Sequence, residues 1–185
     1  MQRVEPVAER ECIARTSGVR CDFGIFVDTR NKLPANAFQT LDDEGRPILV
    51  FTSTLLFDAR NADEIAFVMA HEVAHHIEGH ISRQKRNVAE GARVFAEAEA
   101  RRGGNAKDVE YALLRGAQVG AFAYPKIHEL EADALGTIIA ARSGFDPVKG
   151  AEFFNRIPDP GDRFLGTHPP NAQRIETVRR TAAGL

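Results

Sequence analysis

The clearest hydrophobic pattern in the chain is a run of six apolar residues, Ile65 to Ala70, which leads directly into a polar cluster. That cluster contains His71, Glu72, His75 and His76. An apolar stretch of this kind predicts a buried helix, and ionisable groups are costly to bury unless they are paired or bind a metal ion. The polar centre of this helix therefore needs a chemical reason.

Upstream of this helix, apolar and polar residues alternate in short stretches. A first helix is predicted from Val4 to Arg15, with Val7 and Ile13 on its core face. The loop at 42–45 has the composition of a hairpin turn. Strands are predicted over residues 21–28, 36–39 and 47–52, and a short helical turn over residues 55–58. These elements predict a small mixed or antiparallel sheet, with mostly antiparallel pairing.

Downstream of the polar cluster, helical periodicity is interrupted by glycine, proline and capping residues. Asn61 to Glu64 has the form of a capping box, and Gly79 has the form of a helix end, so these residues delimit the central helix. Gly116 and Gly120 indicate either a membrane contact or, as we favour, close packing against a neighbouring helix. The later helices are predicted over residues 82–102, 108–124, 126–142, 146–156 and 170–180.

These elements predict an α+β fold, mostly helical, with a small sheet beside the central helix. A length of 185 residues fits one domain with a substantial core. Within it, residues 1–19 hold the N-terminal helix and residues 20–56 the sheet. Residues 61–143 hold the helices around the polar cluster, and residues 146–182 the C-terminal helices.

Composition narrows the possible partners and compartments. A net charge of -2 argues against a nucleic-acid-binding protein, which normally has a basic excess. No apolar run approaches the roughly 20 residues of a transmembrane span. The first residues, MQRVEPVAERE, lack the apolar core of a signal peptide. We therefore expect either a cytoplasmic protein or a periplasmic or otherwise exported one from which a signal was removed. No sequence feature indicates an oligomeric state.

The two cysteines bear on the compartment. Cys12 and Cys21 are nine residues apart and flank a Ser-Gly turn. They could form a disulfide between the first helix and the first strand, which would indicate an oxidising compartment. The sequence is equally consistent with two small, buried free thiols.

A metal ion would explain the polar centre of the predicted helix. Successive helical residues advance by about 100°, so His71 and His75 lie one turn apart on one face, with Glu72 beside them. The pattern H-E-x-x-H is typical of zinc sites in which both histidines are ligands and the Glu is a general base. The alternative is a helix with hydrogen-bonded core histidines.

A catalytic zinc usually has three protein ligands, so a further one must lie elsewhere. His80 is out of register with the pattern H-E-x-x-H-x-x-G-x-x-H. On a continuing helix it would also point about 180° away from His71. We interpret His80 and His76 as structural or surface histidines.

The segment IHELEADALG offers a better source of the third ligand. Glu129 and Asp133 are four residues apart and share a helix face, whereas Glu131 points elsewhere. Glu129 is a candidate zinc ligand, and Asp133 is a candidate acceptor for the ring N–H of a ligating histidine. The alternative is a solvated acidic face. The apolar neighbours of these acids favour a buried helix.

Together, HEVAHH and HELEADALG resemble the gluzincin metallopeptidase family that includes the CaaX prenyl protease, the HtpX membrane protease and soluble periplasmic proteases of the BepA type. Thr167-His168-Pro169-Pro170, with Arg174, resembles the family's closing motif. Asn36-Ala37-Phe38, followed by Ile48 to Phe51, resembles its substrate-binding edge strand. The resemblance covers about residues 20–180. It departs at Tyr124 to Ile127, where many members have a Ser-Arg pair, and the chain lacks the spans of the membrane members.

This resemblance implies a zinc endopeptidase of the soluble, BepA-like branch, with one Zn²⁺ per chain held by His71, His75 and Glu129. It implies that Glu72 is the general base. His168 would donate to the oxyanion, and Arg174 would orient the site. The substrate would be an extended or misfolded polypeptide, and the process would be envelope protein quality control. The residues that would bind this polypeptide are Asn36, Ala37, Ile48, Leu49, Val50 and Phe51.

Two other functions fit the same residues. A metal-stabilised binding or chaperone-like module would keep the zinc site but close or inactivate it. A zinc hydrolase for non-peptide amides would share every ligand.

Overall fold

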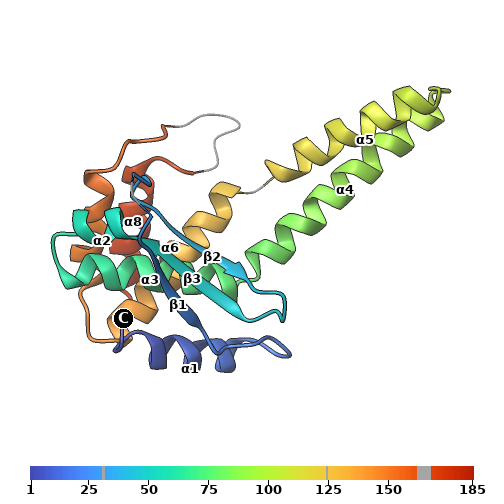
Figure 1. The fold of residues 1–185 in the computed structure, drawn as a ribbon. Coiled ribbons are helices and arrows are strands. Elements are labelled where there is room, and N and C mark those ends of the chain that lie inside the picture. Colours follow the sequence, from blue (N-terminus) through green and yellow to red (C-terminus); the bar gives the residue numbers. More distant parts are fainter. Residues whose placement is uncertain (31, 124, 162–167) are drawn as a thin grey trace.

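The computed structural model describes residues 1–30, 32–123, 125–161 and 168–185. Two residues of the motifs quoted above, Tyr124 and Thr167, lie outside these ranges. The described chain has an α+β fold, mostly helical, with one small sheet, as predicted (Figure 1).

The elements agree with the predicted ones to within about three residues at most ends, which is the usual uncertainty of helix and strand limits. In chain order they are α1 (Glu5–Arg15), β1 (Gly24–Asp28), β2 (Ala37–Leu41), β3 (Pro47–Thr52), α2 (Ser53–Asp58), α3 (Ala62–Ile77), α4 (His80–Arg101), α5 (Ala106–Ala121), α6 (Pro125–Arg142), α7 (Pro147–Gly150), the 3-10 helix η1 (Ala151–Asn155) and α8 (Asn171–Ala182).

The 146–156 helix was predicted as one piece, and this prediction is wrong. It is divided into α7 and η1. The division falls at Gly150, where a Cβ atom would lie 2.6 Å from the Cβ of Phe67 in α3. Close packing on α3 therefore requires glycine at a position where glycine also disfavours a continuing α-helix.

β3 is the central strand of the sheet, with β1 on one side and β2 on the other. β2 pairs with it antiparallel, as predicted, but β1 runs parallel to it, so the predicted mostly antiparallel pairing is wrong for β1. β3 is also the most apolar strand, and both Leu49 and Phe51 are 0% exposed. A central strand with a covered face is shielded from water, so apolar residues are favoured along it.

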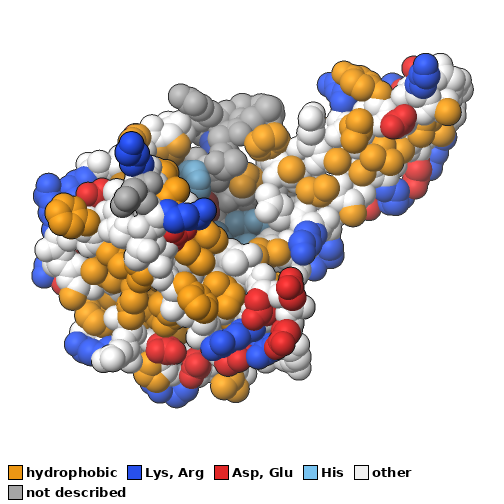
Figure 2. All heavy atoms as spheres, in the orientation of Figure 1, with side chains coloured by type: hydrophobic (Ala, Val, Ile, Leu, Met, Phe, Trp, Pro, Cys, Tyr) orange, Lys and Arg blue, Asp and Glu red, His pale blue; other side chains and the backbone are white. Residues whose placement is uncertain are grey.

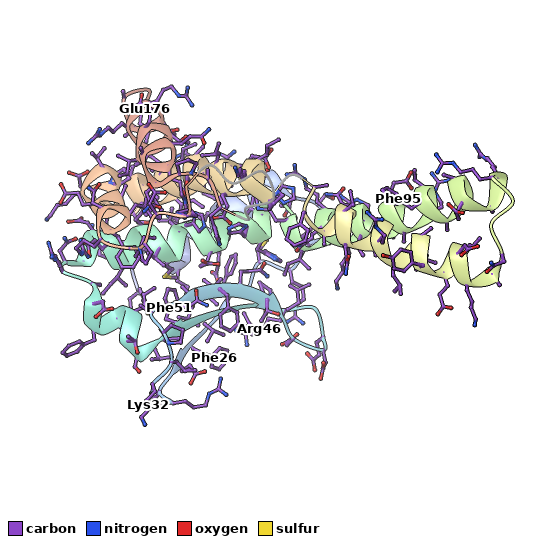
Figure 3. All side chains as sticks on the ribbon, turned by 90° about the horizontal axis from the view of Figure 1, so that it is seen from above. Phe26, Lys32, Arg46, Phe51, Phe95 and Glu176 are labelled. Carbon is purple, nitrogen blue, oxygen red and sulfur yellow. A yellow bond between two sulfur atoms is a disulfide. The ribbon has the colours of Figure 1, made fainter. Side chains whose placement is uncertain are left out.

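α3 lies between the sheet and α6, with α8 packed against the far side of α6 (Figure 3). α6 approaches α3 closely at Gly136, where a Cβ atom would lie 3.0 Å from the backbone N and Cα of His71. At the start of α3, the Asn61 side chain accepts a hydrogen bond from the Glu64 backbone N–H, as a capping box requires. The Glu64 carboxylate does not complete the box. It instead accepts from the backbone N–H of Arg60 and pairs with Arg156.

α4 and α5 form a helical hairpin that projects from the rest of the molecule (Figures 1 and 2). A Cβ atom at Gly116 would lie 2.1 Å from the carbonyl oxygen of Gly91, and one at Gly120 would lie 2.1 Å from that of Asn87. The favoured prediction of close packing between helices is therefore confirmed. No helix within the described ranges is both long enough and apolar enough to cross a membrane.

α1 is joined to the segment before β1 by a disulfide between Cys12 and Cys21. The structure thus favours the disulfide over the two free thiols. Ile13 is 68% exposed, so its predicted place in the core is wrong. The buried face of α1 instead follows the spacing of Val4, Ala8 and Cys12, which are four residues apart and share one side of the helix.

Candidate metal centre

The two histidines of the H-E-x-x-H pattern share one face of α3, as their spacing predicts. Their Nε2 atoms lie 3.0 Å apart, and the two rings meet edge to face. The apolar run before them packs into the core, which fixes the side of α3 that carries them. Glu72, the next residue along, is buried and lines the same cavity.

Glu129 reaches this pair from α6. Its Oε2 lies 3.6 Å from His71 Nε2, and its Oε1 lies 3.3 Å from His75 Nε2. In a tetrahedral zinc site with bonds of about 2.0–2.1 Å, two ligand atoms are about 3.3 Å apart. The three separations lie around this value, so His71, His75 and Glu129 form a donor set of the right chemistry and size for such an ion.

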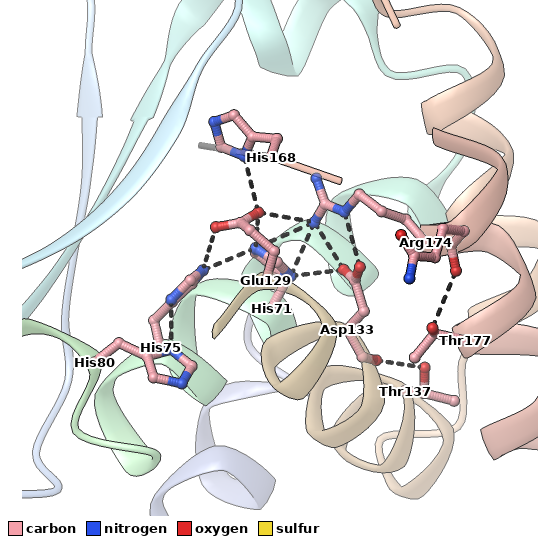
Figure 4. A network of polar contacts seen from close by, with 10 residues as sticks. His71, His75, His80, Glu129, Asp133, Thr137, His168, Arg174 and Thr177 are labelled. Atoms are coloured by element: carbon pink, nitrogen blue, oxygen red, sulfur yellow. Dashed lines mark hydrogen bonds and ion pairs between the residues drawn. The ribbon is translucent and has the colours of Figure 1, made fainter. Parts of the chain in front are cut away.

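Asp133 lies behind His71, one turn after Glu129. Its Oδ1 is 2.9 Å from His71 Nδ1, so the ring nitrogen away from the cavity faces a carboxylate (Figure 4). Arg174 of α8 forms a fork with the same carboxylate, with contacts of 2.7 and 2.8 Å. Asp133 is 0% exposed, and burial alone would raise its pKa. Arg174 and His71 outweigh burial and lower that pKa.

His168 and Arg174 both contact Glu129. His168 Nδ1 lies 3.0 Å from Glu129 Oε2, and Arg174 Nη2 lies 3.4 Å from the same oxygen. Burial would raise the pKa of Glu129, but His168, His75, His71 and Arg174 hold it well below its usual value. Glu129 is therefore held as a carboxylate. The imidazole of His168 is about half exposed at the rim of the site, whereas Arg174 is buried behind it.

His80 lies closer to the site than we predicted. Its Nδ1 is 2.8 Å from His75 Nδ1, and its Nε2 is 3.0 Å from Glu131 Oε2. The expectation that His80 points away assumed a continuing helix, but Gly79 has a left-handed φ of 65° and the chain turns there. The helix end at Gly79 is the sequence signal that His80 does not follow the periodicity of α3.

His76 and Glu131 are two further ionisable residues near the candidate ligands. His76 is a structural histidine, as predicted: its Nε2 lies 2.7 Å from the carbonyl oxygen of Arg20, and its ring meets Phe23 edge to face. Glu131 points away from Glu129, as predicted, and it pairs with His80 and Arg83. Burial, followed by the charge of His75, lowers the pKa of His80 to about 3.

The candidate ligands open onto a cavity of about 780 Å³, in which Glu72 also lies. Figure 2 shows histidine side chains in the recess between the main body and the base of the α4–α5 hairpin. Asn36 and Ala37, at the start of β2, line this cavity. Residues 48–51 do not. Both sides of β3 are already paired, so the prediction that Ile48, Leu49, Val50 and Phe51 form the edge for a substrate is wrong. The strand beside the cavity is β2.

A His-His-Glu donor set with a second glutamate beside it, on the floor of an open cavity, is the arrangement of a metal-dependent peptidase. Comparison with known proteins agrees with this class. The sequence model of Peptidase family M48 matches residues 6–182, and the chain belongs to this family of metal-dependent peptidases. The resemblance inferred from the motifs is thereby confirmed.

Three relatives illustrate the similarity. The beta-barrel assembly-enhancing protease of Escherichia coli O157:H7 is 27% identical over 186 residues, covering 92% of this chain and 36% of the relative. The protein of the same name from Yersinia pestis is 26% identical with the same coverage. A relative from Vibrio cholerae is 31% identical over 187 residues, which cover 92% of this chain and 37% of the relative. The chain thus spans just over a third of the length of these relatives.

Proposed function

We propose that this chain is a zinc-dependent endopeptidase that cleaves extended or misfolded polypeptide segments. The observation that carries the proposal is the convergence of His71, His75 and Glu129 on one cavity beside Glu72. A bound zinc ion would supply Lewis acidity, which polarises a scissile carbonyl and makes a water molecule more acidic. One ion per chain would occupy this site.

Glu72 is proposed as the general base. It lies on α3 between the two ligating histidines in sequence and is buried at the cavity. Its carboxylate would accept the proton of the attacking water and later deliver it to the leaving amine. A partly desolvated carboxylate suits both steps, because less bulk water competes with it for the proton.

The surrounding charges would hold these groups in place. Asp133 accepts at His71 Nδ1, which leaves Nε2 unprotonated and directed at the cavity. Arg174 fixes Asp133 and contacts Glu129, so it would orient both carboxylates. His168, on the rim, would donate a hydrogen bond to the developing oxyanion, an effect typically worth a few kcal/mol.

The substrate would bind as an additional strand along β2. Among the described residues β2 pairs only with β3, and residues 34–39 line the cavity along it. Main-chain hydrogen bonds to such an edge recognise extended peptides with little dependence on their side chains. We therefore expect broad sequence preference and selection for unfolded segments.

We further propose that the protein acts in quality control of the cell envelope, in the periplasm or an equivalent exported location. The Escherichia coli and Yersinia pestis relatives are named beta-barrel assembly-enhancing proteases. The Cys12–Cys21 disulfide supports an oxidising compartment. These relatives are much longer than this chain. That they share substrates or partners with it is therefore part of the proposal.

Replacing Glu72 by Gln tests the proposal. Cleavage of an unfolded protein such as casein should fall by about 100-fold or more, because the proton acceptor is lost. Zinc content should stay at one ion per chain, and the melting temperature should change little. Glu176→Gln, an exposed glutamate on α8 labelled in Figure 3, is the matched control and should keep full activity.

The same experiment separates the alternatives. A binding or chaperone-like module would bind zinc and unfolded protein but cleave nothing, in the wild type or in the variant. The open cavity of about 780 Å³ favours the peptidase over a sterically closed site. A zinc hydrolase for non-peptide amides would leave casein intact while remaining dependent on Glu72 for its own substrate.

A further inference from the structure

The two candidate histidine ligands are supported in different ways at the ring nitrogen that faces away from the cavity. His71 Nδ1 meets the carboxylate of Asp133 directly, at 2.9 Å. His75 Nδ1 meets another imidazole, that of His80, at 2.8 Å (Figure 4). His80 in turn reaches Glu131 through its Nε2, at 3.0 Å. Both ligands are therefore connected to a carboxylate, one directly and one through an inserted ring.

Each of these carboxylates is held by an arginine. Arg174 forks onto Asp133, and Arg83 Nη1 lies 2.5 Å from Glu131 Oε2. The two chains of contacts are thus parallel: His71, Asp133 and Arg174 on one side, and His75, His80, Glu131 and Arg83 on the other. A carboxylate behind a ligating imidazole fixes its tautomer and ring orientation. This parallel suggests that the second chain serves the same purpose.

The protons in the second chain have one consistent arrangement once His75 binds a metal ion. Nε2 of His75 faces Glu129 and His71, so as a ligand it carries no proton and the neutral ring is protonated at Nδ1. Nδ1 of His80 must then accept that hydrogen bond. A neutral His80 consequently carries its proton on Nε2 and donates it to Glu131.

We propose that Glu131 and His80 form a relay that positions His75 as a metal ligand. The proposal rests on the zinc site proposed above and adds two positioning residues to it. It also gives the start of α4 a role, because His80 and Arg83 both lie in the first turn of that helix. The base of the hairpin is thereby connected to the metal centre.

A second metal ion is the competing explanation, because donor atoms of His80, His128 and Glu131 lie within 4.8 Å of one another. Two observations argue against it. The Arg83 guanidinium lies 2.5 Å from the Glu131 oxygen that would be a ligand, whereas Arg174 is 3.4 Å from the Glu129 oxygen. The rings of His80 and His128 are stacked at 13° to one another, so their in-plane lone pairs run side by side instead of converging.

Zinc affinity, measured by competition with a chelator, tests the relay. His80→Leu removes the acceptor at His75 Nδ1 and should weaken zinc binding by about 10- to 100-fold. His80→Asn offers an oxygen at the position of Nδ1 and should stay within about threefold of wild type. His76→Leu is the matched control: it removes a buried imidazole next to His75 in sequence that makes no contact with the site, and should not change affinity. Glu131→Gln should cost only about a fewfold, far less than Glu129→Ala.

Imidazole nitrogen NMR of the zinc-loaded wild type provides a second readout that does not depend on any variant folding. We expect His80 to be protonated on Nε2 alone. A proton on its Nδ1 would overturn the relay, as would His80→Leu and His76→Leu having the same affinity. Two zinc ions in the wild type and one in His80→Leu would favour the second metal site instead. A wild type that binds zinc without cleaving casein would sink only the peptidase proposal, whereas one that binds no zinc would sink both.

Discussion

The metal centre and the α4–α5 hairpin place their charges in opposite environments. At the centre, Asp133 is 0% exposed, and Glu129 and Arg174 are also buried, with Arg174 in contact with both carboxylates. On the hairpin, Arg93 forms ion pairs with Glu90 and Glu97 that are exposed and lie one turn apart. The hairpin is joined instead by backbone contact at its glycines.

This difference predicts how each region responds to change. Buried charges depend strongly on one another, because removing one leaves its partner without compensation in a poorly solvated place. Exposed pairs of neighbouring residues are screened by water and contribute little. The centre is built from α3, α6 and α8, which are far apart in sequence, whereas the hairpin is built from two consecutive helices. A substitution at the centre should therefore destabilise the whole fold, whereas one in the hairpin should affect mainly the hairpin.

The largest effect should come from Arg174→Met. This change leaves the fully buried carboxylate of Asp133 without its fork and should reduce the free energy of unfolding by about 3–5 kcal/mol. Urea denaturation measures it. Arg179→Met, an exposed arginine on the same helix, should be nearly neutral. Similar losses in the two variants would contradict the distinction between buried and exposed charges.

A smaller effect, and one that depends on pH, should come from Glu64→Gln at the start of α3. Glu64 is 1% exposed and pairs with Arg156 at 2.6 Å. Burial alone would raise its pKa, but Arg156 and the backbone N–H of Arg60 outweigh burial and lower it below the ordinary value of 4.5. The stability due to this group is therefore fully present above about pH 4.5 and is lost as the pH falls through the lowered pKa.

We expect Glu64→Gln to cost roughly 2 kcal/mol near neutral pH, with the difference from wild type shrinking in acid. Thermal unfolding across a pH series measures both. The hairpin provides the control: Glu90→Gln removes an exposed partner of Arg93, and its curve should follow that of the wild type throughout. A difference that is independent of pH would show that the Glu64 charge is not responsible.

The smallest and most local effect should come from Gly116→Leu in the hairpin. A side chain there meets the backbone of Gly91, so α4 and α5 must separate, at a cost of about 1–3 kcal/mol that better helix propensity partly offsets. Hydrogen exchange should increase beyond the first turn of α4, in residues 84–121, while zinc content should be unchanged. Gln118→Leu, on the exposed side of α5, should not increase exchange. Loss of zinc in Gly116→Leu would show that the hairpin and the centre are more strongly coupled than we expect.

Much of the secondary structure could be predicted from the sequence, because it depends on local rules. The capping residue Asn61 and the helix end at Gly79 both mark real boundaries of α3. The sheet was harder to predict. The alternation in a strand shows which face is buried but not which strand lies beside it, so the parallel pairing of β1 and the central place of β3 were not predicted.

By itself, the sequence determined the donor chemistry of the candidate centre: two histidines one helical turn apart, a glutamate between them and a carboxylate pair four residues apart. Helical geometry makes these relations independent of the rest of the fold. Only the tertiary structure decided which nitrogen of each histidine faces the cavity, that His80 returns to His75 after Gly79, and that β2 is the strand edge beside the site. These features depend on how separate helices and strands pack against one another, and residue spacing within a single helix carries no information about that packing.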